Sequence, residues 1–338
     1  MVSPFPAAAR PAIDRALMTA FGTVEFETAT PIPGGLGGAG LWRVRVGGIA
    51  YVLRIEGARD AFRDPVRGYA CMRIAASALL APRVRYACAA DGVAIMDLVA
   101  PHALAPDFPG AGHDLMVELA QAVRLLHETP AFPPLVDYLD GLDALIGQHR
   151  RTGLLDPAAT DDLFARHGEL RAAYRTLESD RVSSHNDLNP GNVLYDGDRL
   201  WLIDWESAFL ADRYVDLATV ANWFARSPAG EDTLLTTYFG RAPSAEQRAR
   251  LYLMRQVNHI FYGVMFLNGA AAERPDARLA DRSLAATDLQ ALGVRLATGA
   301  LNLSAWDDRV IYGKARLAAA LDGLRDPAFA EALALLPA

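Results

Sequence analysis

Residues 184–194 read SHNDLNPGNVL, and residues 202–206 read LIDWE. The first segment carries a carboxylate at Asp187 and a carboxamide at Asn192, and the second adds the carboxylate of Asp204 at the end of an apolar run. Mg²⁺ prefers such oxygen ligands, and phosphoryl transfer needs positioning and charge neutralisation more than covalent chemistry. The two segments therefore indicate a site for Mg²⁺ and a triphosphate. The alternative is that these are polar loop-capping residues, a common use of Asp, Asn and Gly.

The composition is that of a folded protein large enough for two lobes, with 338 residues of which 52% are apolar. A net charge of −7 gives no support for binding nucleic acid or an anionic membrane, but it favours a cationic small molecule. Cys71 and Cys88 have neither metal-ligand spacing nor a disulfide framework. No signal-peptide pattern and no apolar run of about 20 residues is found. We expect a cytoplasmic protein, and the sequence does not indicate its oligomeric state.

Residues 1–98 are expected to form an N-terminal nucleotide-binding lobe with a small, mainly antiparallel sheet. A glycine-rich turn precedes two alternating segments joined by Gly47 and Gly48, which predicts a hairpin. Periodicity predicts helices at residues 12–21 and 67–80, and it predicts strands at residues 23–27, 41–46, 51–55, 84–87 and 92–96.

Residues 99–338 are expected to form a larger, mainly helical C-terminal lobe that holds the catalytic loop and the acceptor site. Leu115, Leu119, Ala122 and Leu126 share one face of an expected helix. A hairpin at residues 193–203 interrupts the helical pattern. Further helices are predicted at residues 135–149, 158–178, 215–224, 234–239, 245–268, 283–297 and 309–324.

Residues 185–192 and 203–206 resemble the aminoglycoside phosphotransferase and choline kinase superfamily, which shares the protein-kinase-like fold. The resemblance extends in order from the glycine-rich turn to about Phe224. It implies an α+β, bilobal fold and a dependence on ATP and Mg²⁺. It also implies that Asp187 is the catalytic base and that Asn192 and Asp204 bind Mg²⁺, while His185 and Asp216 act as structural braces of the catalytic loop.

The same resemblance assigns the nucleotide-binding residues. Backbone amides of a glycine loop can approach phosphates closely, because glycine has no side chain to prevent it. Arg54 occupies the position of the protein-kinase lysine that contacts the α- and β-phosphates, and its permanent charge and fork suit phosphate oxygens. Residues 96–99 resemble the interlobe hinge that pairs with adenine. The expected nucleotide contacts are Gly34, Gly35, Gly37, Gly38, Arg54, Met96, Asp97 and Val99.

The helix that follows Arg54 departs from the family pattern. Gly68 stands where a glutamate would pair with the strand cation. Asp64, Asp60 or Glu56 is a candidate substitute, and the alternative is that the ion pair is missing.

The acceptor site is the least determined part of the sequence. Glu206, two residues after Asp204, resembles choline and thiamine kinases more than aminoglycoside kinases. A protonated or quaternary amine would need a carboxylate and aromatic faces, although aromatic residues also fill helical cores. The candidate acceptor-binding residues are Trp205, Glu206, Trp223, Tyr262, Phe266 and Trp306.

Three functions are compatible with these features. The leading hypothesis is an ATP- and Mg²⁺-dependent kinase that phosphorylates a hydroxyl of a small, amine-bearing alcohol resembling choline, thiamine or an aminoglycoside. A nucleotide-binding pseudokinase or regulatory protein is the second, because of Gly68 and the unusual Gly37 and Gly38. Protein kinase activity is disfavoured, since no activation-segment signature follows Asp204.

Overall fold

The computed structural model describes residues 4–33, 38–102, 104, 108, 112–225, 227–285 and 288–337. The chain divides into two units. Across the described residues, no helix is both long and apolar enough to span a membrane. The predicted lobe boundary at residues 98 and 99 falls inside the first unit, so that division stays a prediction. The first unit comprises Met1–Leu135, Arg181–Asp216 and Trp223–Gly240, and the second comprises Val136–Asp180, Leu217–Asn222 and Arg241–Ala338.

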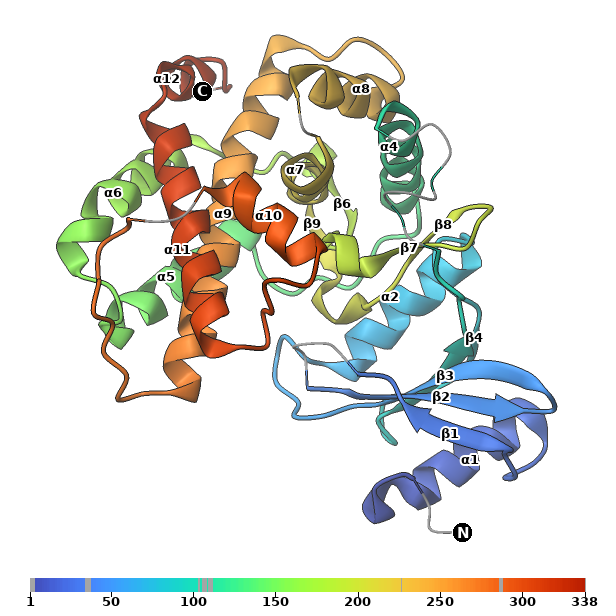
Figure 1. Cartoon of the computed structure of the whole chain (residues 1–338). Coiled ribbons are helices and arrows are strands. Elements are labelled where there is room, and N and C mark those ends of the chain that lie inside the picture. Colours follow the sequence, from blue (N-terminus) through green and yellow to red (C-terminus); the bar gives the residue numbers. More distant parts are fainter. Residues whose placement is uncertain are drawn as a thin grey trace. The chain divides into compact units, whose positions relative to one another are not determined.

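The first unit contains a five-stranded antiparallel sheet in the order β1-β2-β3-β5-β4 (Figure 1). Gly47 and Gly48 join β2 to β3, and both have a positive φ that side chains disfavour. Arg54 lies on β3, the middle strand, opposite Leu41 of β2 and Ala94 of β5. Its backbone is therefore held from both sides. The strands are β1 (Thr28–Pro31), β2 (Gly40–Val46), β3 (Ile49–Ile55), β4 (Val84–Cys88) and β5 (Val93–Asp97).

Two helices pack against this sheet. Helix α1 (Arg10–Phe21), which follows the short helix η1 (Ala7–Ala9), contacts β4 and β5. Helix α2 (Pro65–Ser77) contacts β4 and the short helix η4 (Trp205–Ser207). The apolar core under α1 includes Ile13, Leu17, Val44, Leu53 and Ile95. Helix α2 therefore touches both the sheet, at β4, and the segment after Asp204.

The predicted strand at residues 23–27 is wrong, because the first strand begins at Thr28. The Thr23 hydroxyl accepts a hydrogen bond from the Glu25 backbone amide, which forms a turn in place of an extended segment. Phe26 packs edge-on against Phe5 instead of facing a sheet neighbour. The alternating pattern thus arose from a turn with one partly buried aromatic residue.

The rest of the first unit surrounds the catalytic loop. Helix α4 (His113–His127) packs against α8 (Pro228–Phe239) and β6. The predicted hairpin is confirmed as β7 (Val193–Tyr195) and β8 (Leu200–Leu202), preceded by the short helix η3 (Pro190–Asn192). A strand pair that the sequence did not reveal, β6 (Arg181–Ser184) with β9 (Phe209–Asp212), encloses this region. Both of its strands are only four residues long, too short for a clear periodic signal.

The second unit is helical. Helices α9 and α11 run side by side (Figure 1), and α5 and α12 also pack on α9. Glycines bring α9 and α11 together, since a Cβ at Gly263 would lie 2.5 Å from the Leu317 side chain. The mixed class, an antiparallel sheet followed by a mainly helical region, is confirmed. The helices are α5 (Tyr138–Thr152), α6 (Pro157–Ala173), η2 (Glu178–Asp180), α9 (Ala245–Glu273), α10 (Leu289–Ala297), α11 (Trp306–Arg325) and α12 (Pro327–Ala334), with α7 (Arg213–Phe224) divided between the units.

Candidate active site

The catalytic loop leaves β6 and is anchored by backbone hydrogen bonds to one buried carboxylate. The amide of His185 donates to Asp216 Oδ2 over 2.8 Å, and the amide of Asn186 donates to Oδ1 over 2.7 Å. Asn186 has a φ of 63°, a left-handed conformation that asparagine tolerates better than most residues. Two peptide groups of the loop are thus fixed by a side chain at the start of α7.

Asp216 is itself held by a histidine. His127 Nε2 donates to Asp216 Oδ2 over 3.1 Å, while its Nδ1 lies 2.8 Å from the Tyr238 hydroxyl. Burial disfavours the charge of Asp216, but the hydrogen bond and charge of His127 outweigh burial and lower the pKa of this carboxyl. His185 Nε2 donates to the Ile203 carbonyl over 2.9 Å. This chain of contacts supports the expected brace function of His185 and Asp216.

The carboxylate of Asp187 is oriented by two carboxamides. Asn189 Nδ2 donates to Asp187 Oδ1 over 2.9 Å, and Asn192 Nδ2 donates to Oδ2 over 3.0 Å. Asn192 Nδ2 also donates to the Asp187 carbonyl over 2.8 Å. These bonds fix the direction of the Asp187 carboxylate. Asn189 had not been singled out, although its spacing from Asp187 matches an ordinary side-chain contact within a tight loop.

The same bonds leave Asn192 suited to a cation. They use its amide nitrogen, and among the described residues its Oδ1 oxygen has no hydrogen-bond partner. The Ile203 amide donates to the Asn192 carbonyl over 3.0 Å, and Asp204 is the residue directly after this backbone pair. An asparagine oxygen and one carboxylate fit Mg²⁺, which binds few protein ligands and completes its shell with water and phosphate. No cluster of three or more His, Cys, Asp or Glu residues in the described chain offers an alternative site.

Asp204 adopts an unusual backbone conformation at the end of β8. Its φ is 67°, in the left-handed region that aspartate enters at a cost. The helix η4 begins directly after it, and the Trp205 ring packs on His185 with centroids 4.6 Å apart. The residue directly after Asp204 is thus packed against the catalytic loop.

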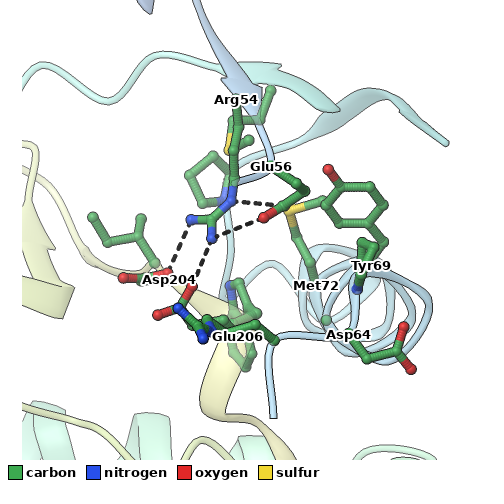
Figure 2. Close-up of a pocket in the computed structure, with 14 residues that line it drawn as sticks. Arg54, Glu56, Asp64, Tyr69, Met72, Asp204 and Glu206 are labelled. Atoms are coloured by element: carbon green, nitrogen blue, oxygen red, sulfur yellow. Dashed lines mark hydrogen bonds and ion pairs between the residues drawn. The ribbon is translucent and has the colours of Figure 1, made fainter. Parts of the chain in front are cut away.

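Arg54 lies among three carboxylates (Figure 2). Its Nε donates to Glu56 Oε1 over 2.8 Å, its Nη1 to Asp204 Oδ1 over 3.0 Å, and its Nη2 to Glu206 Oε2 over 2.8 Å. Burial alone would lower the pKa of Arg54, but the charges of Asp204, Glu56 and Glu206 raise it. Burial, together with the nearby charge of Asp204, raises the pKa of Glu206. The cluster links the central strand directly to the expected magnesium ligand.

Of the three candidate partners Glu56, Asp60 and Asp64, Glu56 is the one that pairs with Arg54. The other two substitutes have different partners, because Asp64 caps α2 by accepting from the Val66 amide and Asp60 pairs with Arg63. Gly68 instead faces the backbone, with its missing Cβ 3.6 Å from the Trp205 carbonyl oxygen. The ion pair of Arg54 is therefore present, and its partner Glu56 directly follows β3.

The expected nucleotide-binding residues are only partly described. Gly34, Gly35 and Gly37 lie outside the described residues, while Gly38 has a φ of 75°. Met96 lines a cavity of about 50 Å³ together with Arg54 and Ile203. Asp97 and Val99 line a second cavity of about 270 Å³. The Asp97 carboxylate is bound by Arg85, and the Val99 amide has no hydrogen-bond partner within the described residues.

The candidate acceptor residues fall in both units. In the first unit, Trp205 is buried and Glu206 pairs with Arg54, while Trp223 lies near the end of α7. In the second unit, Tyr262 and Phe266 are stacked with centroids 6.4 Å apart, and Trp306 Nε1 donates to the Ala270 carbonyl.

Cations of the chain itself already cover two of these aromatic faces. The Arg316 guanidinium lies 5.2 Å from the Tyr262 ring, and the Arg274 guanidinium lies 4.8 Å from the Trp306 ring. The three candidate acceptor residues of the second unit, Tyr262, Phe266 and Trp306, are buried. Their contacts are those of a packed interior, so their binding of an acceptor stays a prediction.

Comparison with known proteins places the chain in a family. The model of the phosphotransferase enzyme family matches residues 28–253. Protein LicA of Haemophilus influenzae is 46% identical over 54 residues, which cover 16% of this chain and only 20% of that protein. A choline/ethanolamine kinase family protein from Mesorhizobium loti has a TM-score of 0.69 at 20% identity, covering 96% of this chain and 98% of the other.

A second solved structure has a bound nucleotide. A spectinomycin phosphotransferase in complex with ADP and spectinomycin has a TM-score of 0.55 at 15% identity, covering 80% of this chain and 93% of the other. At these identities the structural likeness establishes the fold, which is the one predicted from the sequence. The family model spans more than half of the sequence, and the chain therefore belongs to the phosphotransferase enzyme family.

Proposed function

We propose that this protein is a cytoplasmic, ATP- and Mg²⁺-dependent kinase that phosphorylates a hydroxyl of a small, amine-bearing alcohol. The observation that carries the proposal is the loop in which Asn189 and Asn192 orient the Asp187 carboxylate. Among the described residues the Oδ1 oxygen of the same Asn192 has no hydrogen-bond partner, and the Asn192 backbone pairs with Ile203, the residue before Asp204. A base and two cation ligands in this arrangement are what in-line phosphoryl transfer requires.

In this mechanism Asp187 orients the acceptor hydroxyl and accepts its proton. Asn192 Oδ1 and the Asp204 carboxylate hold Mg²⁺, which when bound neutralises charge on the phosphates. Transfer is direct, without a phosphoenzyme. Asp216 and His185 keep the loop in shape through the peptide groups that they contact.

The proposed nucleotide site combines backbone and side-chain contacts. Gly34, Gly35, Gly37 and Gly38 provide amides for the phosphates, and Arg54 provides the cation. At the hinge, Met96 borders the site, while the Asp97 carbonyl and the Val99 amide pair with adenine. The unpartnered Val99 amide among the described residues supports this role.

An amine-bearing acceptor is favoured by charge. The protein has a net charge of −7, and three carboxylates surround the single guanidinium of Arg54. Two similar structures, a choline/ethanolamine kinase family protein and a phosphotransferase in complex with spectinomycin, are named for compounds that carry an amine or a quaternary ammonium group. Trp205, Glu206, Trp223, Tyr262, Phe266 and Trp306 are the proposed acceptor-binding residues.

The contacts of Arg54 remove the main reason for the pseudokinase alternative. It depended on the apparent loss of the anionic partner of Arg54, and Glu56 supplies that anion. The remaining departure from the family pattern is in the glycine loop, where Gly37 and Gly38 stand at positions that usually carry side chains.

The test is ADP release with Mg²⁺ and ATP across amino alcohols, aminoglycosides, neutral sugars and homoserine, comparing wild type with Asp187→Ala. We expect stimulation by an amine-bearing alcohol in the wild type and a fall of about 10³-fold in the variant. ADP binding without any acceptor-stimulated release would contradict the enzyme proposal and favour the pseudokinase. Stimulation by neutral sugars alone would refute the amine-bearing acceptor but not the kinase.

A further inference from the structure

Helix α2 offers Arg54 no carboxylate. Gly68 lines the same cavity of about 50 Å³ as Arg54, and a Cβ at position 68 would lie 3.6 Å from the Trp205 carbonyl oxygen. The acidic residues at the start of the helix are otherwise engaged, Asp64 with the Val66 amide and Asp60 with Arg63. In protein kinases the strand cation is positioned by a glutamate of this helix. Here that contribution is absent from the helix.

Glu56 occupies the matching role from the position directly after the strand. Strand β3 ends at Ile55, and the Glu56 amide still donates to the Gly92 carbonyl over 2.8 Å, so the backbone remains paired there. Glu56 and Arg54 are therefore neighbours through their closeness in sequence. Glu56 Oε1 accepts from Nε over 2.8 Å, and Oε2 lies 3.4 Å from Nη2. The two side chains are 13% and 14% exposed, which limits screening by water. Glu56 thus holds the Nε edge and leaves Nη1 and Nη2 directed at Asp204 and Glu206.

Helix α2 is tied to the magnesium segment by a different contact. Arg67 is buried and donates from Nε to the Ala208 carbonyl over 3.1 Å and from Nη2 to the Glu206 carbonyl over 2.7 Å. It also donates to the carbonyls of Ala61 and Phe62. The helix therefore contacts the segment after Asp204 through backbone carbonyls and close packing at Gly68, and it does not contribute a carboxylate to Arg54.

We propose that Glu56 is the positioning residue for Arg54, so that the direction of the phosphate-binding cation is set by the residue directly after β3 and not by a carboxylate of α2. This inference rests on the proposed function, because Arg54 is taken to contact the nucleotide phosphates. Without Glu56, the guanidinium keeps only the carboxylates of Asp204 and Glu206 as partners. Its existing contact with Asp204 would then compete more strongly with Mg²⁺.

The experiment compares Glu56→Ala and Glu56→Gln with wild type by ADP titration calorimetry, with Mg²⁺ and without acceptor, and by kcat and KM for ATP. Glu128→Gln is the matched control, because Glu128 also pairs with an arginine, Arg124, but both are exposed. We expect about tenfold weaker ADP binding for Glu56→Ala, from the loss of one oriented charge-assisted contact. We expect kcat to fall roughly 100-fold, as for other small misplacements of reacting groups. The half-saturating Mg²⁺ concentration should rise, which a purely structural loss would not produce.

A second-site variant gives the sharper test. Gly68→Glu in the Glu56→Ala background returns a carboxylate from the helix side, and a Cβ there makes only ordinary contacts. It should recover about tenfold of the lost kcat, whereas Gly68→Gln in the same background, of equal size but uncharged, should recover none. Equal recovery by both, or by neither, would contradict the proposal.

The two proposals fail in different ways. ADP affinity and kcat within about twofold of wild type in both Glu56 variants would overturn the positioning role while leaving the kinase proposal intact. Absence of acceptor-stimulated turnover in the wild type would overturn the kinase proposal, and ADP affinity would still decide the role of Glu56. If wild type binds no ADP, both proposals are wrong.

Discussion

The catalytic loop and the Arg54 cluster are built on opposite plans. The loop at residues 184–192 depends on a helix, because Asp216 at the start of α7 fixes its peptide groups. Arg54 takes one of its three carboxylates from Glu56, directly after its own strand, while the neighbouring helix presents only Gly68. Support from a distant element requires the whole unit to be folded, whereas support from a residue two positions away is local. In the proposed phosphotransfer site, the catalytic loop thus depends on a distant helix, whereas Arg54 has one partner that is its neighbour in sequence.

The largest effect should come from removing the helix support of the loop. Asp216→Ala leaves the amides of His185 and Asn186 and the His127 ring without their acceptor, and each unsatisfied buried donor costs roughly 1–3 kcal/mol. We expect unfolding free energy to fall by about 4 kcal/mol, measured by urea denaturation.

Asp137→Ala is the matched control for that variant. Asp137 also accepts from two backbone amides, at the start of α5, but it is half-buried. Loss of such a cap costs about 1 kcal/mol. Equal losses for the two variants would contradict the special role of Asp216.

The stabilisation by Asp216 should depend on pH. Because the pKa of Asp216 is lowered, its contribution to the unfolding free energy is complete above the ordinary pKa of 3.8 and is lost as pH falls through the pKa of the folded state. The difference in unfolding free energy between wild type and Asp216→Ala should therefore decrease only at acidic pH.

The next effect should come from the Arg54 cluster. Arg54→Ala leaves the carboxylates of Glu56, Asp204 and Glu206 together without a cation. Removing one partner of a largely buried ion pair costs about 3 kcal/mol. Thermal or chemical unfolding without nucleotide measures this cost. A variant as stable as wild type would show that the three carboxylates repel one another little and that the cluster is loosely held.

Arg67→Lys should have a smaller effect on α2. A lysine ammonium lacks the fork with which Arg67 reaches the carbonyls of Ala208 and Glu206, so we expect a loss of about 2 kcal/mol. The control Arg63→Lys alters an exposed pair with Asp60 and should change stability by less than about 0.5 kcal/mol. If both substitutions are neutral, Arg67 does not hold the helix.

Gly68→Ala should have the smallest effect, and in the stabilising direction. An alanine Cβ would lie 3.6 Å from the Trp205 carbonyl, an ordinary contact, and alanine favours a helix by up to about 1 kcal/mol over glycine. Gly263→Ala, where the Cβ would lie 2.5 Å from Leu317, should instead destabilise by about 1 to 3 kcal/mol. Destabilisation by Gly68→Ala would show that close packing, and not the absence of a carboxylate, is the reason for glycine there.

The two regions also differ in how far the sequence predicts them. The catalytic loop is a local pattern, so the spacing of Asp187, Asn192 and Asp204 was enough to indicate a common site. The partner of Arg54 required a choice among Glu56, Asp60 and Asp64, and periodicity could not show that the last two cap a turn and a helix. Arg67 gave no signal, because its acceptors are backbone carbonyls, which every sequence contains.

The fold was predictable to a similar degree. The hairpins and the long helices follow from apolar periodicity and glycine turns, and they were found. The β6 and β9 pair was missed, since its four-residue strands are recognisable only through each other. The aromatic residues of the second unit could not be separated from core by sequence, because stacking such as that of Tyr262 on Phe266 satisfies either role.

The most direct test of the proposed catalytic role of Asp187 is the rate of phosphoryl transfer by Asp187→Ala at saturating ATP, Mg²⁺ and the best acceptor, with ADP affinity measured on the same samples. We expect a fall of about 10³-fold in rate with ADP affinity within about twofold of wild type, because in the proposed mechanism the loop performs the chemistry and Arg54 holds the nucleotide. A rate within tenfold of wild type would contradict it.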